Sequence, residues 1–518
     1  MNVFLVVLLV IVLLLAALAL WDLVQPRHAI LRNFPIVGHL RYLLEKIGPE
    51  LRQYIVTGND VERPFSRDQR AWIYTSSKQR NNYSGFGTDN DLDRARGHLI
   101  VTHSAFPKAE PPHDAACSAP DYVLPPAIVL GALHGRAKAF RPESIVNISG
   151  MSFGALGAKA VEALNRGAAI AGCLQVTGEG AIAPAHRSGG ELVFQVGTGY
   201  FGVRDPNGKF SLPRLQELVE GAPVRAIEIK LSQGAKPGHG GILPGAKVTR
   251  EIAAIRGVEP GVDCISPAGH SAFGDIDSMI DFIERVADAT GLPVGIKSAV
   301  GEIAFWDELA ARMAARGEGP DFITIDGGEG GTGAAPYVFA DHVALPFRVA
   351  MPRVYRAFAA HDLADRVPFV GSGRLGFPAE ALTALALGCD LVHVGREAML
   401  AIGCIQAQRC HTGHCPSGVA TQSRWLQRGL EPDLKSRRLA QYLRTLRKEL
   451  LELARTCGHS HPAFVSATQI EMLGSEGRSH TLEEVFGLDF DHGQPTAADR
   501  DAVLLEMGLL PAGATPSN

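Results

Sequence analysis

Three cysteines in the carboxyl-terminal third of the chain are close enough in sequence to bind one inorganic group. Cys404, Cys410 and Cys415 follow the pattern C-x5-C-x4-C. The pattern lacks the C-x-x-C unit of dithiol redox proteins, and structural zinc sites usually hold cysteines in tighter pairs. Zinc would need His411 or His414 as a fourth ligand, whereas thiolates alone are the ordinary ligands of iron–sulfur clusters. The spacing favours iron–sulfur and leaves zinc open.

Several ionisable residues stand at the ends of apolar runs, where a barrel presents side chains to a ligand. Lys230 and Lys297 lie in "EIKLSQ" and "VGIKSA", and Lys236 follows the first of these runs. Lysines at such places could stabilise a reduced flavin or hold the carboxylates of a substrate. Glu179, in "TGEG", could orient an amine or relay a proton, or it could pair with one of these lysines. Spacing leaves both roles of Glu179 open.

Two glycine-containing turns indicate a phosphate site. The runs at 368–374 and 391–397 contain "GSGR" and "VGRE". In (β/α)8 barrels the last two strands are commonly followed by phosphate-binding loops, and Arg374 or Arg396 would add charge. The stretch "GEGGTG" at 328–333 fits G-x-G-x-x-G, but no convincing acidic residue follows on a second strand. We interpret it as a loop that cradles a ligand.

The elements that would position these residues alternate between short apolar runs and helical stretches. Continuous apolar runs are typical of parallel strands covered on both faces. Eight runs therefore predict an α/β fold, a (β/α)8 TIM barrel, with an open doubly wound sheet as the alternative. Two insertions, 186–203 and the cysteine segment, interrupt the rhythm. The eight runs are 145–150, 173–180, 226–234, 264–269, 294–301, 322–331, 368–374 and 391–397.

The N-terminal residues have the features of a membrane anchor. Residues 3–21 carry no charge and nearly span a hydrocarbon core of about 30 Å. A cleaved signal peptide is the alternative, but no positive residue precedes the apolar run, whereas Arg27, Arg32 and Arg41 follow it. The positive-inside rule then predicts a single-pass membrane protein with its catalytic domain in the cytoplasm.

The predicted organisation has five parts, and the body of the chain has an ordinary globular composition. The 518 residues are 46% hydrophobic and 20% charged, with a formal net charge of −4 and no basic stripe. We therefore expect no nucleic-acid partner. The five parts are a transmembrane anchor at 1–24, an irregular wrapping segment at 25–144, the barrel at 145–403, the cysteine loop at 404–422 and a helical extension at 423–518.

Six motifs, in order over about residues 140–490, resemble the synthase domain of glutamate synthase large subunits. The resemblance implies an FMN-binding (β/α)8 barrel with a [3Fe–4S] cluster. It also implies an oxidoreductase acting on CH–NH2 donors, in which 2-oxoglutarate and ammonia form 2-iminoglutarate and reduced flavin converts this to glutamate. The motifs are "SGMSFGALGAKAVEAL", "TGEG", "EIKLSQGAKPGHGGILPGAKV", "GGEGGTGAAP", "GCIQAQRCHTGHCPSGVATQ" and "LEEVFG".

The resemblance also implies roles for individual positions. Cys404, Cys410 and Cys415 would be the cluster ligands. Catalytic residues would be Glu179, Lys230 and Lys236, with Gln233 and Arg256 binding substrate. Gly373, Gly395 and Arg396 would hold the flavin phosphate. The remaining flavin contacts would be Met151, Ser152, Gly154, Ala155, Gln195, Gly199, Lys297 and Gly371.

The sequence departs from this family near the substrate. His239 and Ile242, in "GHGGILPG", stand where the family usually has glutamate and glutamine, and "ISPAGHSAF" replaces "ISPPPHHDIY". A different keto acid or amine, or a membrane-tethered electron-transfer or ligand-sensing subunit, therefore remains an alternative. No glutaminase-type N-terminal cysteine is present, so we expect ammonia that is free or comes from a partner. With no second dinucleotide site, we expect electrons from a ferredoxin-like protein, an NAD(P)H flavoprotein subunit or a membrane carrier.

Overall fold

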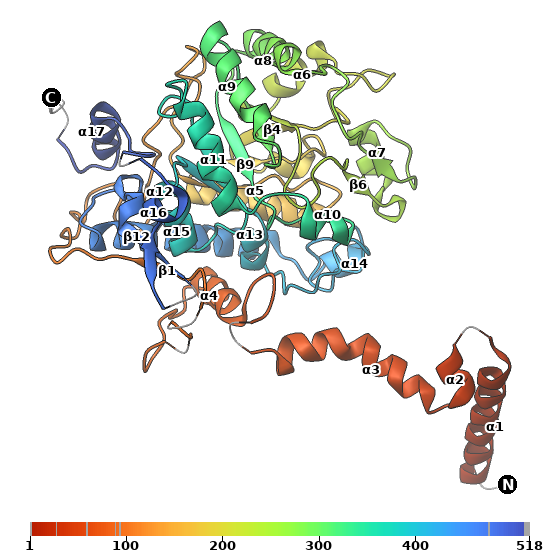
Figure 1. The fold of residues 1–518 in the computed structure, drawn as a ribbon. Helices are drawn as coiled ribbons and strands as arrows, with labels where there is room; N and C mark the ends of the chain where they lie inside the picture. The colour runs from red at the N-terminus through yellow and green to blue at the C-terminus, as the bar shows by residue number, and fades with distance from the viewer. Residues whose placement is uncertain are drawn as a thin grey trace. The chain divides into compact units, whose positions relative to one another are not determined.

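Eight parallel strands close into a barrel, which confirms the predicted (β/α)8 fold (Figure 1). Side chains on both faces of these strands are buried, because helices cover the outside and side chains fill the inside. In order round the barrel the strands are β2 (Val146–Ile148), β3 (Gln175–Val176), β4 (Leu192–Val196), β5 (Val224–Lys230), β8 (Val294–Ser298), β9 (Ile323–Asp326), β10 (Phe369–Ser372) and β11 (Leu391–Val394).

The computed structural model describes residues 3–26, 28–58, 61–88, 90–92, 95–474, 477–489 and 491–511. The chain forms two units, Met1–Arg70 and Ala71–Asn518, and the barrel belongs to the second. Of the positive residues that follow the apolar N-terminus, Arg27 lies outside the described residues.

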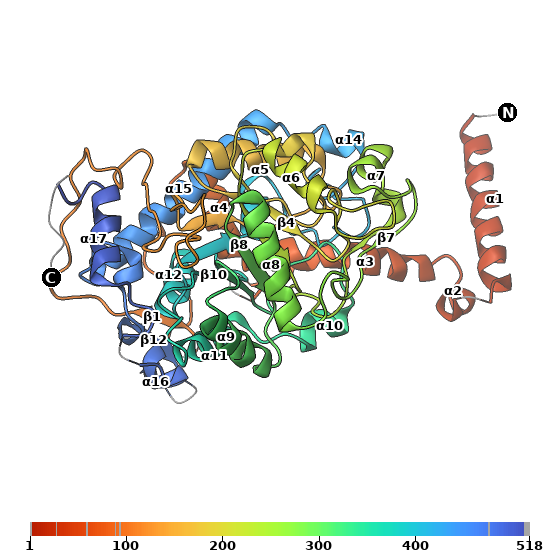
Figure 2. The same cartoon turned by 90° about the horizontal axis from the view of Figure 1, so that it is seen from above.

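Amphipathic helices follow most of the barrel strands (Figure 2). In α8 the apolar face, from Met279 to Ala287, is buried, Asp275 caps the N-terminus, and Gly291 ends the helix in the left-handed conformation. Only a 3-10 turn lies between β3 and β4. The covering helices are α5 (Ala158–Ala171), α6 (Leu212–Glu220), α8 (Ile276–Thr290), α9 (Ala304–Arg316), α11 (Phe347–Ala359), α12 (Pro378–Ala386) and α13 (Arg396–Ala401).

One of the eight predicted strands was wrong, and a predicted insertion contains the strand that replaces it. The run at 264–269 forms only β7 (Cys264–Ile265), which pairs antiparallel with β6 (Ile242–Leu243) outside the barrel. The segment 186–203 contains β4, which is buried along its whole length. Ile265 is exposed, so β7 lacks the two buried faces of a barrel strand. The long insertion instead lies between β5 and α8 and carries α7 (Arg250–Arg256).

Segments on both sides of the barrel sequence pack against the barrel. Leu130 and Phe140 bridge each other and pack with Val176, Val193 and other strand residues in one buried cluster. The carboxyl-terminal helix α15 (Pro432–Thr456) packs along α5. Their close approach requires Gly167, because a Cβ there would lie 2.6 Å from Leu439. The tail adds α14 (Arg424–Gln427), α16 (Leu482–Phe486), α17 (Ala497–Glu506) and the antiparallel sheet β1 (Leu99–Val101), β12 (Ile470–Leu473) and β13 (Ser479–Thr481).

The first unit begins with α1 (Val3–Val24), the one helix among the described residues that is long and apolar enough to cross a membrane. Asp22 near its end is buried and accepts hydrogen bonds from Ile36 N and His39 Nε2. These bonds tie the end of α1 to the first turn of α3 (Gly38–Leu51) and to the segment just before it. Between them lies α2 (Ala29–Asn33), and α4 (Arg67–Ser77) leads into the second unit.

Candidate functional site

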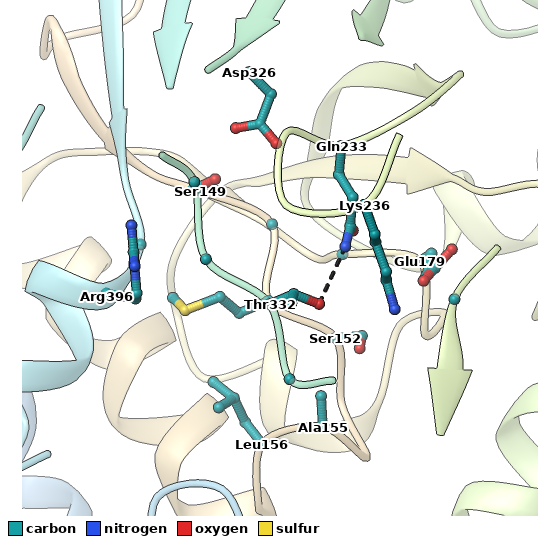
Figure 3. A pocket seen from close by; sticks show the side chains of 18 of the residues that line it. Ser149, Ser152, Ala155, Leu156, Glu179, Gln233, Lys236, Asp326, Thr332 and Arg396 are labelled. Carbon is teal, nitrogen blue, oxygen red and sulfur yellow. Dashed lines mark hydrogen bonds between the residues drawn. The ribbon is translucent and has the colours of Figure 1, made fainter. Parts of the chain in front are cut away.

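A cleft opens at the carboxyl ends of the barrel strands (Figure 3). Its empty space, which is continuous with solvent, is about 1260 Å³. Every strand contributes lining residues at or just beyond its end, from Ser149 after β2 to Arg396 after β11. This is where barrel enzymes carry out their chemistry.

The charge of the cleft favours an anionic ligand. Its walls hold six lysine and arginine side chains against three carboxylates. Figure 3 places Glu179, Gln233 and Lys236 on one side and Arg396 on the other. The cations are Lys230, Lys236, Arg256, Lys297, Arg374 and Arg396, and the acids are Glu179, Asp326 and Glu397.

Glu179 is held rigidly in the cleft by a lysine and two glycines. Lys230 Nζ lies 3.3 Å from Glu179 Oε1. A Cβ added to Gly197 would lie 2.7 Å from the Cβ of Glu179, and one on Gly241 would overlap its Oε1. Burial would raise the pKa of Glu179, but the charges of Lys230 and its other cationic neighbours lower it below its ordinary value. Glu179 therefore stays a carboxylate at neutral pH and pairs with Lys230 on the wall of the cleft.

Lys236 and Gln233, in the loop after β5, bond to the glycine-rich loop after β9. Lys236 Nζ donates to Ala334 O at 2.8 Å, and Gln233 Nε2 donates to Thr332 Oγ1 at 3.1 Å (Figure 3). Burial lowers the pKa of Lys236 to about 8, although Glu179 opposes the shift. Two loops that are far apart in sequence, both lining the cleft, are thus joined by hydrogen bonds.

A polar layer inside the barrel supports the floor of the cleft. Gln195 Nε2 and Thr324 Oγ1 both donate to the buried carboxylate of Glu228, each at 2.6 Å. Lys297 Nζ lies 3.8 Å from Asp326 Oδ2, which also accepts from Gly234 N. A buried carboxylate costs free energy unless it is hydrogen-bonded, so Glu228 fixes the orientation of the Gln195 amide.

The opposite side of the cleft has the features of a phosphate site. Gly373 has a φ of +130°, which lets the backbone turn inward after β10, and Gly395 begins the turn after β11. Arg396 donates to Glu329 O, and burial lowers its pKa. These residues line the cleft beside Ser372 and Arg374. Cations and small residues together suit a phosphate group.

Most of the residues assigned from the sequence line this one cleft, but five do not. Cys404, Cys415, Gly154, Gly199 and Gly371 lie outside its wall. Gly371 is buried within β10.

Arg256 lines the cleft, but its guanidinium is engaged by the protein. It donates to Phe153 O at 2.7 Å and to Cys264 Sγ at 3.6 Å, and it lies 5.2 Å from the centroid of the Phe201 ring. Arg256 thus braces the loop after β2 while adding positive charge behind Glu179.

The three clustered cysteines are electrostatic neighbours. Burial, together with Cys410 and Cys415, raises the pKa of Cys404 to about 12. Burial opposes but does not overcome hydrogen bonds from Ser417 and nearby backbone groups, which lower the pKa of Cys415. No three His, Cys, Asp or Glu side chains surround a single-ion position in the described parts of the chain. Three thiol donors have the chemistry that an iron–sulfur cluster requires of its ligands.

Sequence reasoning missed Lys247, which links the cysteine loop to the wall of the cleft. Its Nζ donates to Ala155 O at 2.8 Å, Cys410 O at 3.2 Å and Ala420 O at 3.3 Å. A buried lysine with three carbonyl acceptors holds backbone segments together. Lys247 lies in the "PGAKV" run, but only the folded chain shows which carbonyls it reaches. Asp326 and the glycine pair Gly197 and Gly241 were missed for the same reason.

Comparisons with known proteins agree with the sequence motifs. The family described as "Conserved region in glutamate synthase" matches residues 127–460. The "Glutamate synthase large subunit-like protein YerD" of Bacillus subtilis (strain 168) is 38% identical over 483 residues, covering 88% of this chain and 91% of that protein. The "Archaeal glutamate synthase (NADPH)" of Methanocaldococcus jannaschii is 36% identical over 316 residues, covering 60% of this chain but only 59% of that protein. Among solved structures, a flavocytochrome b2 with sulfite bound has a TM-score of 0.43 and 13% identity, over 89% of this chain and 91% of that chain.

Proposed function

The chain belongs to the glutamate synthase family, and on that premise we propose that its cleft reduces a 2-imino acid to an amino acid with electrons from bound FMN. Membership makes the chain an oxidoreductase acting on CH–NH2 donors. The proposed substrate is 2-iminoglutarate, formed from 2-oxoglutarate and ammonia. The observation that carries the proposal is the arrangement of Glu179 between Lys230 and Lys236 in one cleft with the phosphate-type side at Arg396.

The residues of the cleft fit FMN. Arg396 and the turns at Gly373 and Gly395 would hold the phosphate, while Ser152 and Ala155 would pack along the ring system. Lys297 and the Gln195 amide fixed by Glu228 are placed to meet the polar edge of the flavin. When bound, reduced FMN would supply a hydride equivalent to the carbon of the imine.

The remaining side chains would bind and orient the substrate. Lys230 and Lys236 offer ammonium groups for the substrate carboxylates. Glu179, being ionised, would hold the positively charged iminium nitrogen and so favour electron flow to the adjacent carbon. The loop pair joined by Gln233 and Thr332 would exclude water above it.

The test is a reoxidation panel on the purified full chain. Denaturation should release FMN, and 2-oxoglutarate plus ammonium should reoxidise the reduced flavin in stopped flow. Pyruvate and oxaloacetate, each with ammonium, are the comparison acids. Flavin that is absent, or not reoxidised by any of these acids, would reject the proposed reaction. Retained flavin without reoxidation would favour the alternative, an electron-transfer or sensing subunit, which Ile242 on the cleft wall supports.

We also expect a pH dependence that comes from Lys236. Its pKa of about 8 means that it is protonated at neutral pH and loses its charge as the pH rises through that value. The KM for the 2-oxo acid should therefore rise above pH 8, by about ten- to a hundredfold, the worth of a charge-assisted hydrogen bond. KM is measured at a fixed concentration of free ammonia, since ammonium also titrates in this range. Lys236→Arg should flatten the rise, and an unchanged rise in Lys236→Ala would assign it to another group.

A second part of the proposal concerns electron entry. Cys404, Cys410 and Cys415 would hold a [3Fe–4S] cluster whose electrons come from a separate donor protein. Lys247, bonded to both Cys410 O and Ala155 O, would keep the cysteine loop against the flavin side of the cleft.

We propose, finally, that α1 anchors the chain in a membrane with the catalytic unit in the cytoplasm. The apolar helix and the positive Arg32 and Arg41 after it support this orientation. Alkaline carbonate should leave the protein in the membrane pellet, and complete extraction would contradict the anchor.

A further inference from the structure

A cluster of four cations lies beside Cys404, at the end of α4 and the start of α15, which lie side by side in Figures 1 and 2. We call Lys78, Arg80, Lys435 and Arg438 the basic patch. Lys78 and Lys435 interact electrostatically with each other and with Arg438. Burial and these like charges lower the pKa of both lysines. Four mutually repelling cations cost stability and are typical of a surface with an anionic partner.

The basic patch lacks compensating acids. None of its four side chains forms an ion pair among the residues that the structure describes. Residues 403–438 contain six lysines and arginines but only two acids, in a chain whose net charge is −4. One of those acids, Asp433, pairs with Arg166. On the same helix, Glu449 accepts from Trp72 and Asn82.

Contacts connect the patch directly to Cys404. Tyr74 Oη donates to Cys404 O at 2.7 Å, and Lys78 Nζ lies 5.7 Å from the centroid of the Tyr74 ring. A Cβ on Gly403 would lie 2.7 Å from Lys435 Nζ. A molecule seated on these cations would therefore stand next to the predicted cluster ligand.

Exposed apolar side chains are sequence neighbours of Cys404 and of the basic patch. Ile405 follows Cys404, and Leu434 precedes Lys435, with 36% and 43% of their surfaces exposed. Protein interfaces typically combine an apolar centre with a charged rim, and electron transfer needs a close approach of the two redox groups.

We propose that the basic patch is the docking surface for a small acidic electron-carrier protein. This rests on the proposed function, because the partner is defined as the donor to the cluster at Cys404. In the docked complex one electron would pass from the reduced carrier to that cluster, so that the carrier is oxidised as the cluster is reduced. The patch joins residues about 360 positions apart in sequence, which is why no basic stripe is visible there.

The experiment uses the full chain in neutral phosphatidylcholine nanodiscs, with a plant-type [2Fe–2S] ferredoxin and a flavodoxin as probes. The variant is Lys78→Glu with Lys435→Glu, and Lys78→Gln with Lys435→Gln is the milder form. The matched control is Lys209→Glu, an exposed lysine just before α6, whose helix lies at the opposite side of the barrel from α4 in Figure 1. The affinity of the oxidised carrier and the rate of flavin reduction by the reduced carrier are measured at low and high salt.

At low salt, the charge-reversed variant should bind the carrier with an affinity about tenfold or more below that of the wild type, and the carrier should reduce its flavin at a rate lower by a similar factor. Both differences should shrink at high salt. The glutamine pair should fall between it and the wild type, and the control should match the wild type. Photoreduction with a deazaflavin should give the same final spectrum in all of them, which shows that each variant is folded and holds its flavin.

Binding of the oxidised carrier needs no electron transfer. The experiment therefore tests the docking surface separately from the proposed electron route through the cluster. A wild-type chain that binds the carrier through the patch but is not reduced contradicts the proposed electron route and supports the surface. Equal affinities in the wild type and the charge-reversed variant, or no binding of either carrier by the wild type, overturns the docking proposal. An effect seen only in nanodiscs with phosphatidylserine assigns the patch to lipid and also overturns it.

Discussion

Glu179→Gln is expected to lower kcat by about 10²- to 10³-fold, the usual loss when one preorganised electrostatic contact is removed from an active site. The substitution keeps the shape of the side chain but removes the charge that would hold the iminium nitrogen. It also leaves the charge of Lys230, 3.3 Å away, without its counterion. Turnover of 2-oxoglutarate with ammonium measures the loss.

Glu179→Gln should change the charge of the cleft without changing its shape. Glu179 occupies space that side chains at Gly197 and Gly241 would otherwise fill, and glutamine fits the same space. FMN content and the deazaflavin end point should stay at wild-type values, because the flavin side of the cleft is untouched. Glu191→Gln, on an exposed glutamate just before β4, is the control and should leave kcat unchanged. A Glu179→Gln enzyme with nearly full turnover would reduce Glu179 to an ion-pair partner of Lys230.

The fold was largely predictable because its signal is local. Seven of the predicted apolar runs form barrel strands, because a short continuous apolar run between helices is typical of a buried parallel strand. The error at Cys264–Ile265 arose because the choice between a barrel and an outer hairpin depends on the pairing partner. That partner, Ile242–Leu243, is defined only in the folded chain. β4 was missed because glycines flank it on both sides, so that the segment 186–203 was interpreted as an insertion.

Site residues could be predicted from the sequence only where the type of side chain itself indicates a chemical role. Lysines at strand ends, the glutamate in "TGEG" and the clustered cysteines can be read from the sequence. The residues that position them could not be read in this way. Gly241 acts by leaving room for a carboxylate that is 62 positions away, and Lys247 acts through backbone carbonyls, which every residue carries. Such roles follow from juxtaposition alone, so the sequence gives no sign of them.

Cys410→Ala should deprive the protein of its iron and sulfide while FMN remains bound. Cys410 is the cysteine of the trio that lines the cleft, so it would lie between the cluster and the flavin. Losing one of three thiolates removes a bond that the cluster needs. Lys247 bonds to the backbone carbonyl of Cys410, which alanine retains, so the loop should keep its position. Flavin reduction by reduced ferredoxin should then fall to the rate of a cluster-free control, whereas deazaflavin photoreduction should continue.

Cys457→Ala separates this effect from a general sensitivity to loss of a thiol. Cys457 is also buried, but it lies at the end of α15 and has no electrostatic contact with the other cysteines. That variant should keep its iron, its FMN and its ferredoxin-driven reduction. Stoichiometric zinc in place of iron in the wild type would contradict the cluster. Undiminished ferredoxin-driven reduction in Cys410→Ala would show instead that electrons reach the flavin by another route, in which case the basic patch beside Cys404 would no longer mark the entrance.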